Sequence, residues 1–255
     1  MTSGNQSKRI LITGASSGLG AEMARQLAAS GNDLALCARR TDRLDALREE
    51  ILAAHPGRRV EVKALDVNDH DQVFEVFRAF ASDLGTIDRV VVNAGLGKGA
   101  PLGTGKFEAN RETAMTNFVG ALAQTEAAME IFRDQGFGHL VMVSSMSAMR
   151  GMPKTMTTYA ATKAGVAHLA EGLRTELHGK DGYQVTVLYP GYIRSEMNEH
   201  VEQQTPLMVS TDKGVRSMVE AMEKEVDSAC IPRLPWSVLA PVMKHAPIPV
   251  LRKLL

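Results

Sequence analysis

A tyrosine and a lysine lie four residues apart in the stretch TYAATKAG, residues 158–165, whose other residues suit an alanine-rich helix. Side chains at this spacing share one helical face, so Tyr159 and Lys163 could act on the same ligand. A phenol has an ordinary pKa of about 10, and a nearby cation lowers that pKa by stabilising the phenolate. The pair could therefore transfer a proton, although this spacing alone is more often found on an ordinary helical surface.

A glycine-rich segment, TGASSGLG at residues 13–20, follows a strand-like run and opens a helical pattern. Its three glycines allow a tight turn and let backbone N–H groups approach a pyrophosphate at the positive end of a helix. A ligand-free turn between a strand and a helix is the alternative. The expected cofactor contacts in this segment are Gly14, Ser16, Ser17, Gly18, Leu19 and Gly20.

Arginines stand where NAD-binding folds normally carry an acid, at the end of the second strand and about 20 residues beyond the glycines. The sequence there reads CARR, and the guanidinium groups of Arg39 and Arg40 could bind the 2′-phosphate of NADP(H). We give Arg39 the main role, whereas Arg40 or Arg43 could simply solvate the end of the strand. NADP(H) is therefore the expected cofactor, and an NAD-preferring dehydrogenase is the alternative.

The composition excludes several classes of function. The 29 basic and 29 acidic residues cancel, which argues against binding nucleic acid through a strong overall field. Two cysteines cannot build a disulfide framework, and the seven histidines show no metal-ligand spacing, so we expect no metal. The chain starts without an apolar block and has no apolar run near the ~20 residues that span a bilayer. A cytoplasmic protein with a small-molecule partner is expected.

Seven apolar or β-branched runs alternate with longer stretches of helical periodicity. The runs are residues 9–13, 33–38, 59–67, 89–95, 139–145, 183–191 and, more weakly, 228–232. Strands that alternate with helices form right-handed βαβ units, which assemble into a parallel sheet with helices on both faces. Long helical patterns cover residues 106–134 and 157–179. We expect a single doubly wound α/β domain of the Rossmann type with about seven strands.

We divide the chain into a dinucleotide-binding and catalytic domain at residues 1–234 and a C-terminal tail at residues 235–255. The tail is apolar and basic, and its four prolines should prevent one continuous helix. Two short amphipathic pieces could cover the substrate cleft or dock on another subunit. Peripheral contact with a membrane surface is the less favoured alternative.

In order along the chain, these motifs resemble those of the short-chain dehydrogenase/reductase family from Thr13 to Ser195. TGASSGLG fits the family's TGxxxGxG, YAATK fits YxxxK, and VSS precedes the family's active-site loop. The family's further motifs match LDV, NAG and PGYIRS in this sequence. By this resemblance, the additional cofactor contacts are Asp66, Val67, Asn93, Ala94, Gly95, Pro190, Gly191, Ile193 and Ser195, together with Tyr159 and Lys163.

The resemblance also implies a catalytic tetrad of Asn117, Ser145, Tyr159 and Lys163. In the family, the tyrosine exchanges a proton with the reacting oxygen while hydride passes directly between nicotinamide and the substrate carbon. The lysine also binds the nicotinamide ribose. Asn117 would position a water for a proton relay, although a helical asparagine could instead bond to nearby backbone. Ser145 would bond the reacting oxygen, although its spacing to Tyr159 is one residue longer than is common in the family. Ser147 is the alternative residue for this role.

The sequence thus predicts an NADP(H)-dependent oxidoreductase that interconverts a carbonyl and an alcohol. Substrate choice should lie in the loops at residues 96–105 and 196–210. Methionines near these loops indicate a medium or large apolar substrate, although they could equally fill the core: Met146, Met149, Met152, Met156, Met197 and Met208. A catalytically idle NADP(H)-binding regulator is the other class of function, and the complete tetrad argues against it. Family analogy implies a homodimer or homotetramer through the long helices.

Overall fold

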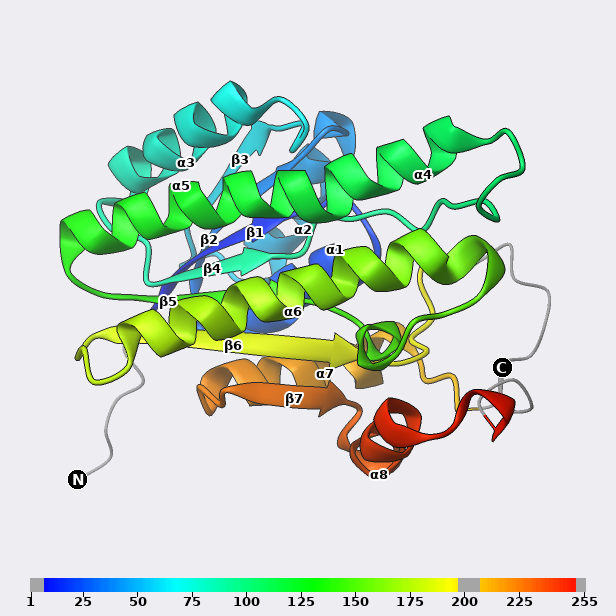
Figure 1. The fold of residues 1–255 in the computed structure, drawn as a ribbon. Helices are drawn as coiled ribbons and strands as arrows, with labels where there is room; N and C mark the ends of the chain where they lie inside the picture. Colours follow the sequence, from blue (N-terminus) through cyan, green and yellow to red (C-terminus); the bar gives the residue numbers. More distant parts are fainter. Residues whose placement is uncertain (1–6, 197–206, 251–255) are drawn as a thin grey trace.

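The computed structural model of the chain describes residues 7–196 and 207–250. Seven parallel strands form one sheet in the order β3-β2-β1-β4-β5-β6-β7 (Figure 1). Each strand falls on one of the seven expected runs, with ends that differ by a few residues. The strands are β1 (Arg9–Thr13), β2 (Asp33–Ala38), β3 (Val60–Ala64), β4 (Arg89–Val92), β5 (Gly138–Val143), β6 (Tyr183–Pro190) and β7 (Ser228–Ile231).

The helices connect these strands and include both of the expected long patterns. The first long pattern is α4, a π-helical turn η1 and α5, which continue one another, and the second is α6. No helix in the described part of the chain is long and apolar enough to cross a membrane. The helices are α1 (Gly18–Ala29), α2 (Thr41–Ala54), α3 (His70–Leu84), α4 (Phe107–Ala114), η1 (Met115–Val119), α5 (Gly120–Gln135), η2 (Met146–Met149), η3 (Lys154–Met156), α6 (Thr157–Leu177), α7 (Thr211–Glu223) and α8 (Arg233–His245).

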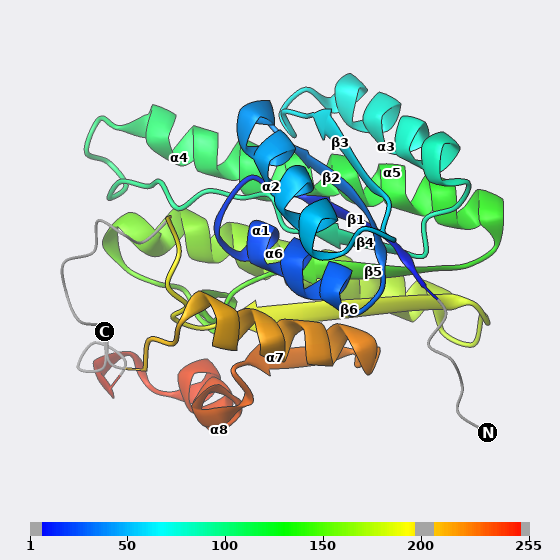
Figure 2. The ribbon, with the colours of Figure 1, turned by 180° about the vertical axis from the view of Figure 1, so that it is seen from behind.

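Two apolar cores lie on the two faces of the sheet, because side chains alternate between the faces along each strand. On β1, Leu11 packs into the core beneath α3, α5 and α6, which cover the front of the sheet in Figure 1. Its neighbours Ile10 and Ile12 pack into the other core, beneath α1, α2 and α7, which Figure 2 shows from behind. The prediction of a single doubly wound α/β domain is confirmed.

The prolines of the C-terminal segment differ in their effect on helix α8. Leu234 has a non-helical backbone, so Pro235 stands at the start of the regular helix, where a missing N–H costs little. The helix then continues through Pro241 and ends at His245, before Pro247. The boundary that we placed between residues 234 and 235 lies inside α8, and the division into domain and tail remains a prediction.

Candidate functional site

The expected site residues gather at the edge of the sheet where the parallel strands have their carboxyl ends. Thr13 and Pro190 end β1 and β6, while Asn93 and Ser145 follow shortly after β4 and β5. This is the edge toward which the strand arrows point in Figure 1. Open parallel sheets bind ligands in the crevice outside this edge, so the topology brings the separate motifs to one site.

The glycine segment forms a backbone cradle that side chains would fill. Gly14 has φ +65° and Gly18 has φ +53°, a conformation that other residues rarely adopt. A Cβ added at Gly20 would lie 2.3 Å from the carbonyl oxygen of Gly14. Helix α1 begins here without a side-chain cap from Ser17, so its first N–H groups remain available. The cradle therefore fits a pyrophosphate at a helix N-terminus.

The NAG motif after β4 braces this cradle. The backbone N–H groups of Asn93 and Ala94 both donate to Oγ1 of Thr13 at 3.0 Å. The side-chain Nδ2 of Asn93 donates to the carbonyl oxygen of Thr13 at 2.9 Å. These three bonds lock the end of β4 to the start of the glycine segment. The polar groups of Asn93 thus act on the cradle in addition to any contact with a cofactor.

Arg40 reaches from the end of β2 across the glycine segment. Its guanidinium donates to Oγ of Ser17 at 2.6 Å and to Oγ of Ser16 at 3.4 Å. The carboxylate of Glu196 bonds to the same guanidinium at 3.2 Å and to Nη1 of Arg43 at 2.5 Å. Two arginines, two hydroxyls and one carboxylate therefore meet where the second strand and the glycine segment come together.

Arg39 lies differently from Arg40, although the two are neighbours in the chain. Arg39 is exposed, and it makes no hydrogen bond or ion pair with the residues that the structure describes.

Burial acts to raise the pKa of Glu196, but the hydrogen bonds from Arg43 and Arg40 outweigh this effect and hold the pKa below its ordinary value. Glu196 is therefore an anion at neutral pH, and sequence reasoning had not connected it with the arginines.

The acid after β3 bonds within its own turn. Oδ1 of Asp66 accepts a hydrogen bond from the backbone N–H of Asn68 at 3.0 Å. Val67 is buried, and a Cβ added at Gly120 would lie 2.9 Å from its carbonyl oxygen. Gly120 thus allows α5 to approach the LDV segment, which the resemblance places in contact with the cofactor. The contacts of Asp66 and Val67 with a cofactor remain predictions.

Tyr159 and Lys163 lie close together on α6, as their spacing predicts. Nζ of Lys163 is 5.8 Å from the centre of the Tyr159 ring and donates to the carbonyl oxygen of Val143 at 2.9 Å. Burial lowers the pKa of Lys163 to about 8. For Tyr159, burial raises the pKa, and a hydrogen bond with Ser145 offsets part of that rise.

The expected lowering of the Tyr159 pKa by Lys163 is therefore wrong for this structure. Burial disfavours the phenolate and raises its pKa by more than the neighbouring hydrogen bond lowers it. The ammonium of Lys163 faces the carbonyl oxygen of Val143, and Ser145 is the group whose hydrogen bond lowers the tyrosine pKa. At neutral pH, Tyr159 is consequently a neutral phenol that can give up a proton.

Three serines compete for the role beside the tyrosine, and the structure gives each a different partner. Ser144 donates to the backbone carbonyl oxygen of Lys163 at 2.7 Å, the strand-end role that we considered for it. Ser145 acts on the pKa of Tyr159 through a side-chain hydrogen bond, which lowers it. Ser147 turns back and donates from its Oγ to Oγ of Ser145 at 3.0 Å. Ser145 is thus the serine that acts on Tyr159, and Ser147 bonds to Ser145.

Asn117 lies in the π-helical turn η1 and bonds to backbone outside its helix. Its Oδ1 accepts from the N–H of Leu96, and its Nδ2 donates to the carbonyl oxygen of Leu96, both at 2.8 Å. A Cβ added at Gly95 would lie 3.2 Å from Oδ1 of Asn117 and 3.5 Å from Nζ of Lys163. Asn117 therefore holds the loop after β4 beside the lysine, and its role in a proton relay remains a prediction.

The segment after β6 lies between the glycine cradle and helix α8. A Cβ added at Gly18 would lie 3.5 Å from Cβ of Ser195, and Ile193 is buried. A Cβ added at Gly191 would lie 2.1 Å from the indole of Trp236. Trp236 therefore packs against the end of β6, a contact between residues far apart in the chain that no local sequence motif indicates.

The substrate loops are only partly described. Residues 197–206, including Met197, lie outside the described residues. Met146 is buried in the structure, whereas Met149, Met152 and Met208 are partly buried. Helix α8 is tied to the loop after η2, because Nη1 of Arg150 donates to the carbonyl oxygen of Lys244 at 2.8 Å.

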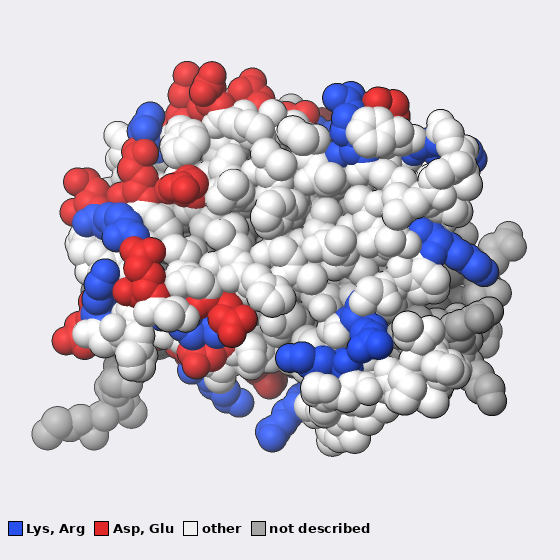
Figure 3. All heavy atoms as spheres, in the orientation of Figure 1, with Lys and Arg blue, Asp and Glu red and all other residues white. Residues whose placement is uncertain are grey.

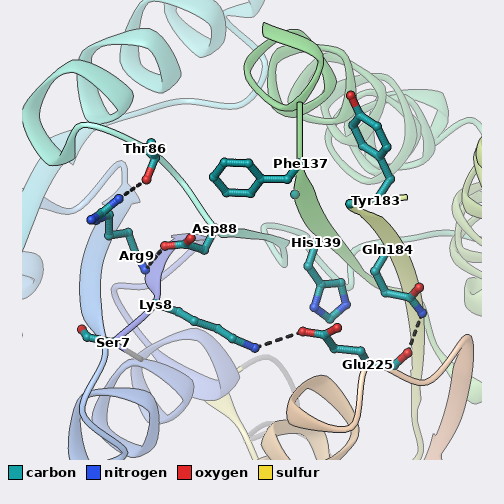
Figure 4. A pocket seen from close by; sticks show the side chains of 12 residues that line it. Ser7, Lys8, Arg9, Thr86, Asp88, Phe137, His139, Tyr183, Gln184 and Glu225 are labelled. Atoms are coloured by element: carbon teal, nitrogen blue, oxygen red, sulfur yellow. Dashed lines mark hydrogen bonds and ion pairs between the residues drawn. The ribbon is translucent and has the colours of Figure 1, made fainter. Parts of the chain in front are cut away.

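A separate cavity of about 660 Å³ lies at the opposite, amino-terminal edge of the strands (Figure 4). Its polar side chains pair mainly with protein groups: Lys8 with Glu225 at 3.0 Å, and Asp88 with the backbone N–H of Arg9 at 2.7 Å. Beside it, the fully buried Arg89 donates to Nδ1 of His139 at 2.9 Å. This cavity lacks the site motifs. No group of three His, Cys, Asp or Glu within residues 7–196 and 207–250 could hold a metal.

Comparison with known proteins agrees with these motifs. The sequence model of the short chain dehydrogenase family matches residues 8–206. An uncharacterized oxidoreductase of Mycobacterium tuberculosis is 50% identical over 243 residues, which cover 95% of this chain and 95% of that protein.

Two solved structures extend the comparison to the fold. An alcohol dehydrogenase from the archaeon Thermococcus sibiricus, complexed with 5-hydroxy-NADP, is 27% identical with a TM-score of 0.78, covering 88% of this chain and 96% of its own. Levodione reductase is 25% identical with a TM-score of 0.80, covering 90% of this chain and 98% of its own. The chain belongs to the short-chain dehydrogenase/reductase family, and its reaction is the oxidoreduction of a CH–OH group with a nicotinamide nucleotide.

Proposed function

We propose that this protein is an NADP(H)-dependent reductase of apolar carbonyl compounds, with Tyr159 as the proton donor. The observation that carries the proposal is that Nζ of the buried Lys163 lies 5.8 Å from the ring centre of Tyr159 on the same helix, while Ser145 follows the end of β5 and acts on the pKa of this phenol through a hydrogen bond. When bound, the nicotinamide nucleotide supplies or accepts the hydride. The side chains then have to hold the reacting oxygen and give it a proton.

Tyr159 suits the reductive direction because its pKa is raised by burial. A neutral phenol donates its proton to the oxygen of a carbonyl as that oxygen gains negative charge. Ser145 stabilises the same developing charge with a hydrogen bond. The buried ammonium of Lys163 adds a positive charge nearby and can reach the nicotinamide ribose, as the family resemblance implies. Alcohol oxidation uses the same groups in reverse and requires the phenolate.

The preference for NADP(H) is supported by the arginines at the end of β2. Arg40 already bonds to hydroxyls of the glycine segment, and Arg40 and Arg43 already share an anion, the carboxylate of Glu196. A 2′-phosphate offers the same kind of acceptor with more negative charge. We therefore transfer the main role in cofactor choice from Arg39 to Arg40 and Arg43.

Binding measurements on single variants test this assignment. Loss of a charge-assisted contact weakens binding by about 10- to 100-fold. Arg40→Ala should therefore lower the affinity for NADPH by that factor and leave the affinity for NADH nearly unchanged. Arg39→Ala, a neighbouring exposed arginine, is the matched control and should change neither affinity much. If Arg39→Ala weakens NADPH more than Arg40→Ala does, the reassignment is wrong; equal tightness of NADH and NADPH in the wild type removes the preference itself.

An apolar substrate of medium or large size is supported by the side chains around the carboxyl edge. Met149, Met152 and Met208 are partly buried there, and thioether side chains adapt to irregular apolar ligands. A panel of 2-alkanones, aryl ketones and cyclic ketones, followed by oxidation of NADPH, would identify the substrate class. Wild-type protein that turns over short polar ketones better than long apolar ones would refute this part of the proposal.

The decisive variant for the chemistry is Tyr159→Phe. It removes the proton donor but keeps the ring, so turnover should fall to near the detection limit while the affinity for NADPH changes little. Tyr183→Phe is the matched control, because Tyr183 lines the separate cavity at the amino-terminal edge of the strands (Figure 4). Equal turnover in Tyr159→Phe and the wild type would show that another group transfers the proton.

A homodimer or homotetramer is supported by an apolar face on the long helices. Exposed large apolar side chains line α4, η1 and α5, and Figure 3 shows a broad central area without charged residues over α5 and α6. Light scattering should give at least a dimer, and Leu122→Glu should weaken it. Val238→Glu on α8 is the control from another exposed surface. The side chains are Phe107, Met115, Phe118 and Leu122.

A further inference from the structure

Ser145 uses its oxygen as an acceptor twice within its own turn. Ser145 caps helix η2, and its Oγ accepts from the backbone N–H of Ser147 at 3.2 Å. The same Oγ accepts from the hydroxyl of Ser147 at 3.0 Å. Ser147 is only 7% exposed, so water has little access to replace its hydroxyl. Both bonds come from one residue two positions along the chain.

A hydroxyl group has one proton to donate and two lone pairs that accept. In Ser145 both lone pairs are filled by Ser147, so only the proton is left for a further partner. In the free protein that partner is Tyr159: burial raises the pKa of its phenol, and a hydrogen bond with Ser145 offsets part of the rise, as expected when the serine donates to the phenol oxygen. Ser145 is therefore arranged to donate toward the site rather than to accept from it.

We propose that Ser147 is a positioning residue that, by filling the acceptor capacity of Ser145, forces the single Ser145 proton out of its own turn, toward Tyr159 in the free protein and toward the reacting oxygen when a substrate is bound. This inference rests on the proposed function, because it specifies how the serine of that site is oriented. A serine that donates stabilises an oxygen that gains negative charge, whereas a serine that accepts does not. Ser147 itself need not touch the substrate.

Without the hydroxyl of Ser147, one lone pair of Ser145 becomes free. The phenol of Tyr159 can then donate to Ser145, which points the tyrosine proton away from the substrate. A hydrogen bond donated by the neutral phenol also favours the protonated form and so raises the tyrosine pKa. Two effects should follow together: slower proton transfer and a Tyr159 that ionises at higher pH.

The matched pair Ser147→Thr and Ser147→Val isolates the hydroxyl. The two side chains have nearly the same shape, so the effect of the added methyl group on packing is common to both, and they differ in the hydroxyl alone. Ser147→Val should lower kcat by about ten-fold relative to Ser147→Thr, the rate equivalent of one hydrogen bond. KM for NADPH should stay the same. Ser147→Ala, which adds no methyl group, should behave like Ser147→Val.

Ionisation of Tyr159 gives a readout without substrate. The tyrosinate absorbance of each variant, minus that of the same variant carrying Tyr159→Phe, reports this residue among the four tyrosines of the chain. Ser147→Val and Ser147→Ala should ionise at higher pH than Ser147→Thr and the wild type. Thermal unfolding confirms that each variant is folded. A purely structural role for Ser147 would lower the melting temperature and leave this difference at zero.

The outcomes separate this proposal from the proposed function. Equal kcat and equal ionisation in Ser147→Thr and Ser147→Val would overturn it, and so would equal losses of kcat in both without a difference in ionisation. A wild type that is inactive on every ketone tested would overturn the proposed function instead. In that case the ionisation comparison still decides whether Ser147 orients Ser145.

Discussion

Adding one methyl group at Gly191 tests whether helix α8 is fastened to the site edge of the sheet. In Gly191→Ala the new Cβ would lie 2.1 Å from Cε2 and Nε1 of Trp236, whereas ordinary contact begins at 3.4 Å. The indole must therefore retreat by roughly 1.3 Å, or the end of β6 must shift by as much. Trp236 is 5% exposed, so it has little free space in which to move.

Overpacking of this kind costs about 1–3 kcal/mol. In a chain of 255 residues each kcal/mol corresponds to about 2–4 °C in the melting temperature. We expect Gly191→Ala to melt at a lower temperature, with tryptophan emission shifted to the red because the indole becomes more exposed. Trp236 is the single tryptophan of the chain, so the emission reports this contact directly.

A double-mutant cycle decides whether the cost arises from the indole. Trp236→Leu removes the ring atoms that the new Cβ would meet, so Gly191→Ala should cost close to nothing in that background. The indole Nε1 has no hydrogen-bond partner among the described residues, and its removal therefore breaks no polar contact. If Gly191→Ala costs the same with and without Trp236, the contact between α8 and the end of β6 does not exist as described.

Two further substitutions have opposite expected effects on stability. Gly172→Ala places a methyl group inside α6 with nothing within 4 Å, so chemical denaturation should show a gain of about 1 kcal/mol; a loss would mean that α6 packs more closely there than the structure shows. Lys163→Met removes a buried ammonium whose pKa is lowered from 10.5 to about 8. Below pH 8 Lys163 is charged in both the folded and the unfolded chain, so burial of its charge destabilises the fold in full. Above pH 10.5 Lys163 is neutral in both, and this destabilisation is absent. The stability of the wild type relative to Lys163→Met should therefore rise by on the order of 3 kcal/mol between these pH values, and a flat difference in urea melts across this range would contradict the lowered pKa.

The local elements could be predicted because each depends on a short segment of sequence. The runs at residues 9–13 and 33–38 coincide with β1 and β2, since strands covered on both faces need continuous apolar residues. The run at residues 59–67 overshoots β3, which ends at Ala64, because Leu65 and Val67 are apolar for a different reason: they are buried in the core after the strand has ended. Apolar character shows burial without distinguishing these cases.

The features of the candidate site also divide into those that a short segment of sequence determines and those that depend on the fold. The glycine segment and the spacing of Tyr159 and Lys163 are local patterns, and the sequence by itself determined both, along with the family. Which of the adjacent arginines Arg39 and Arg40 faces the glycine segment depends on the turn into α2, where successive side chains diverge.

Only the tertiary structure decided the remaining features, because they join residues that are distant in sequence or balance opposing effects. Gly191 and Trp236 meet at the end of β6, and Glu196 meets Arg40 beside the glycine segment. The pKa of Tyr159 depends on whether burial or the neighbouring groups contribute more, and burial does. Sequence spacing shows which groups are present, whereas their distances and their access to water, which set these energies, exist only in the folded chain.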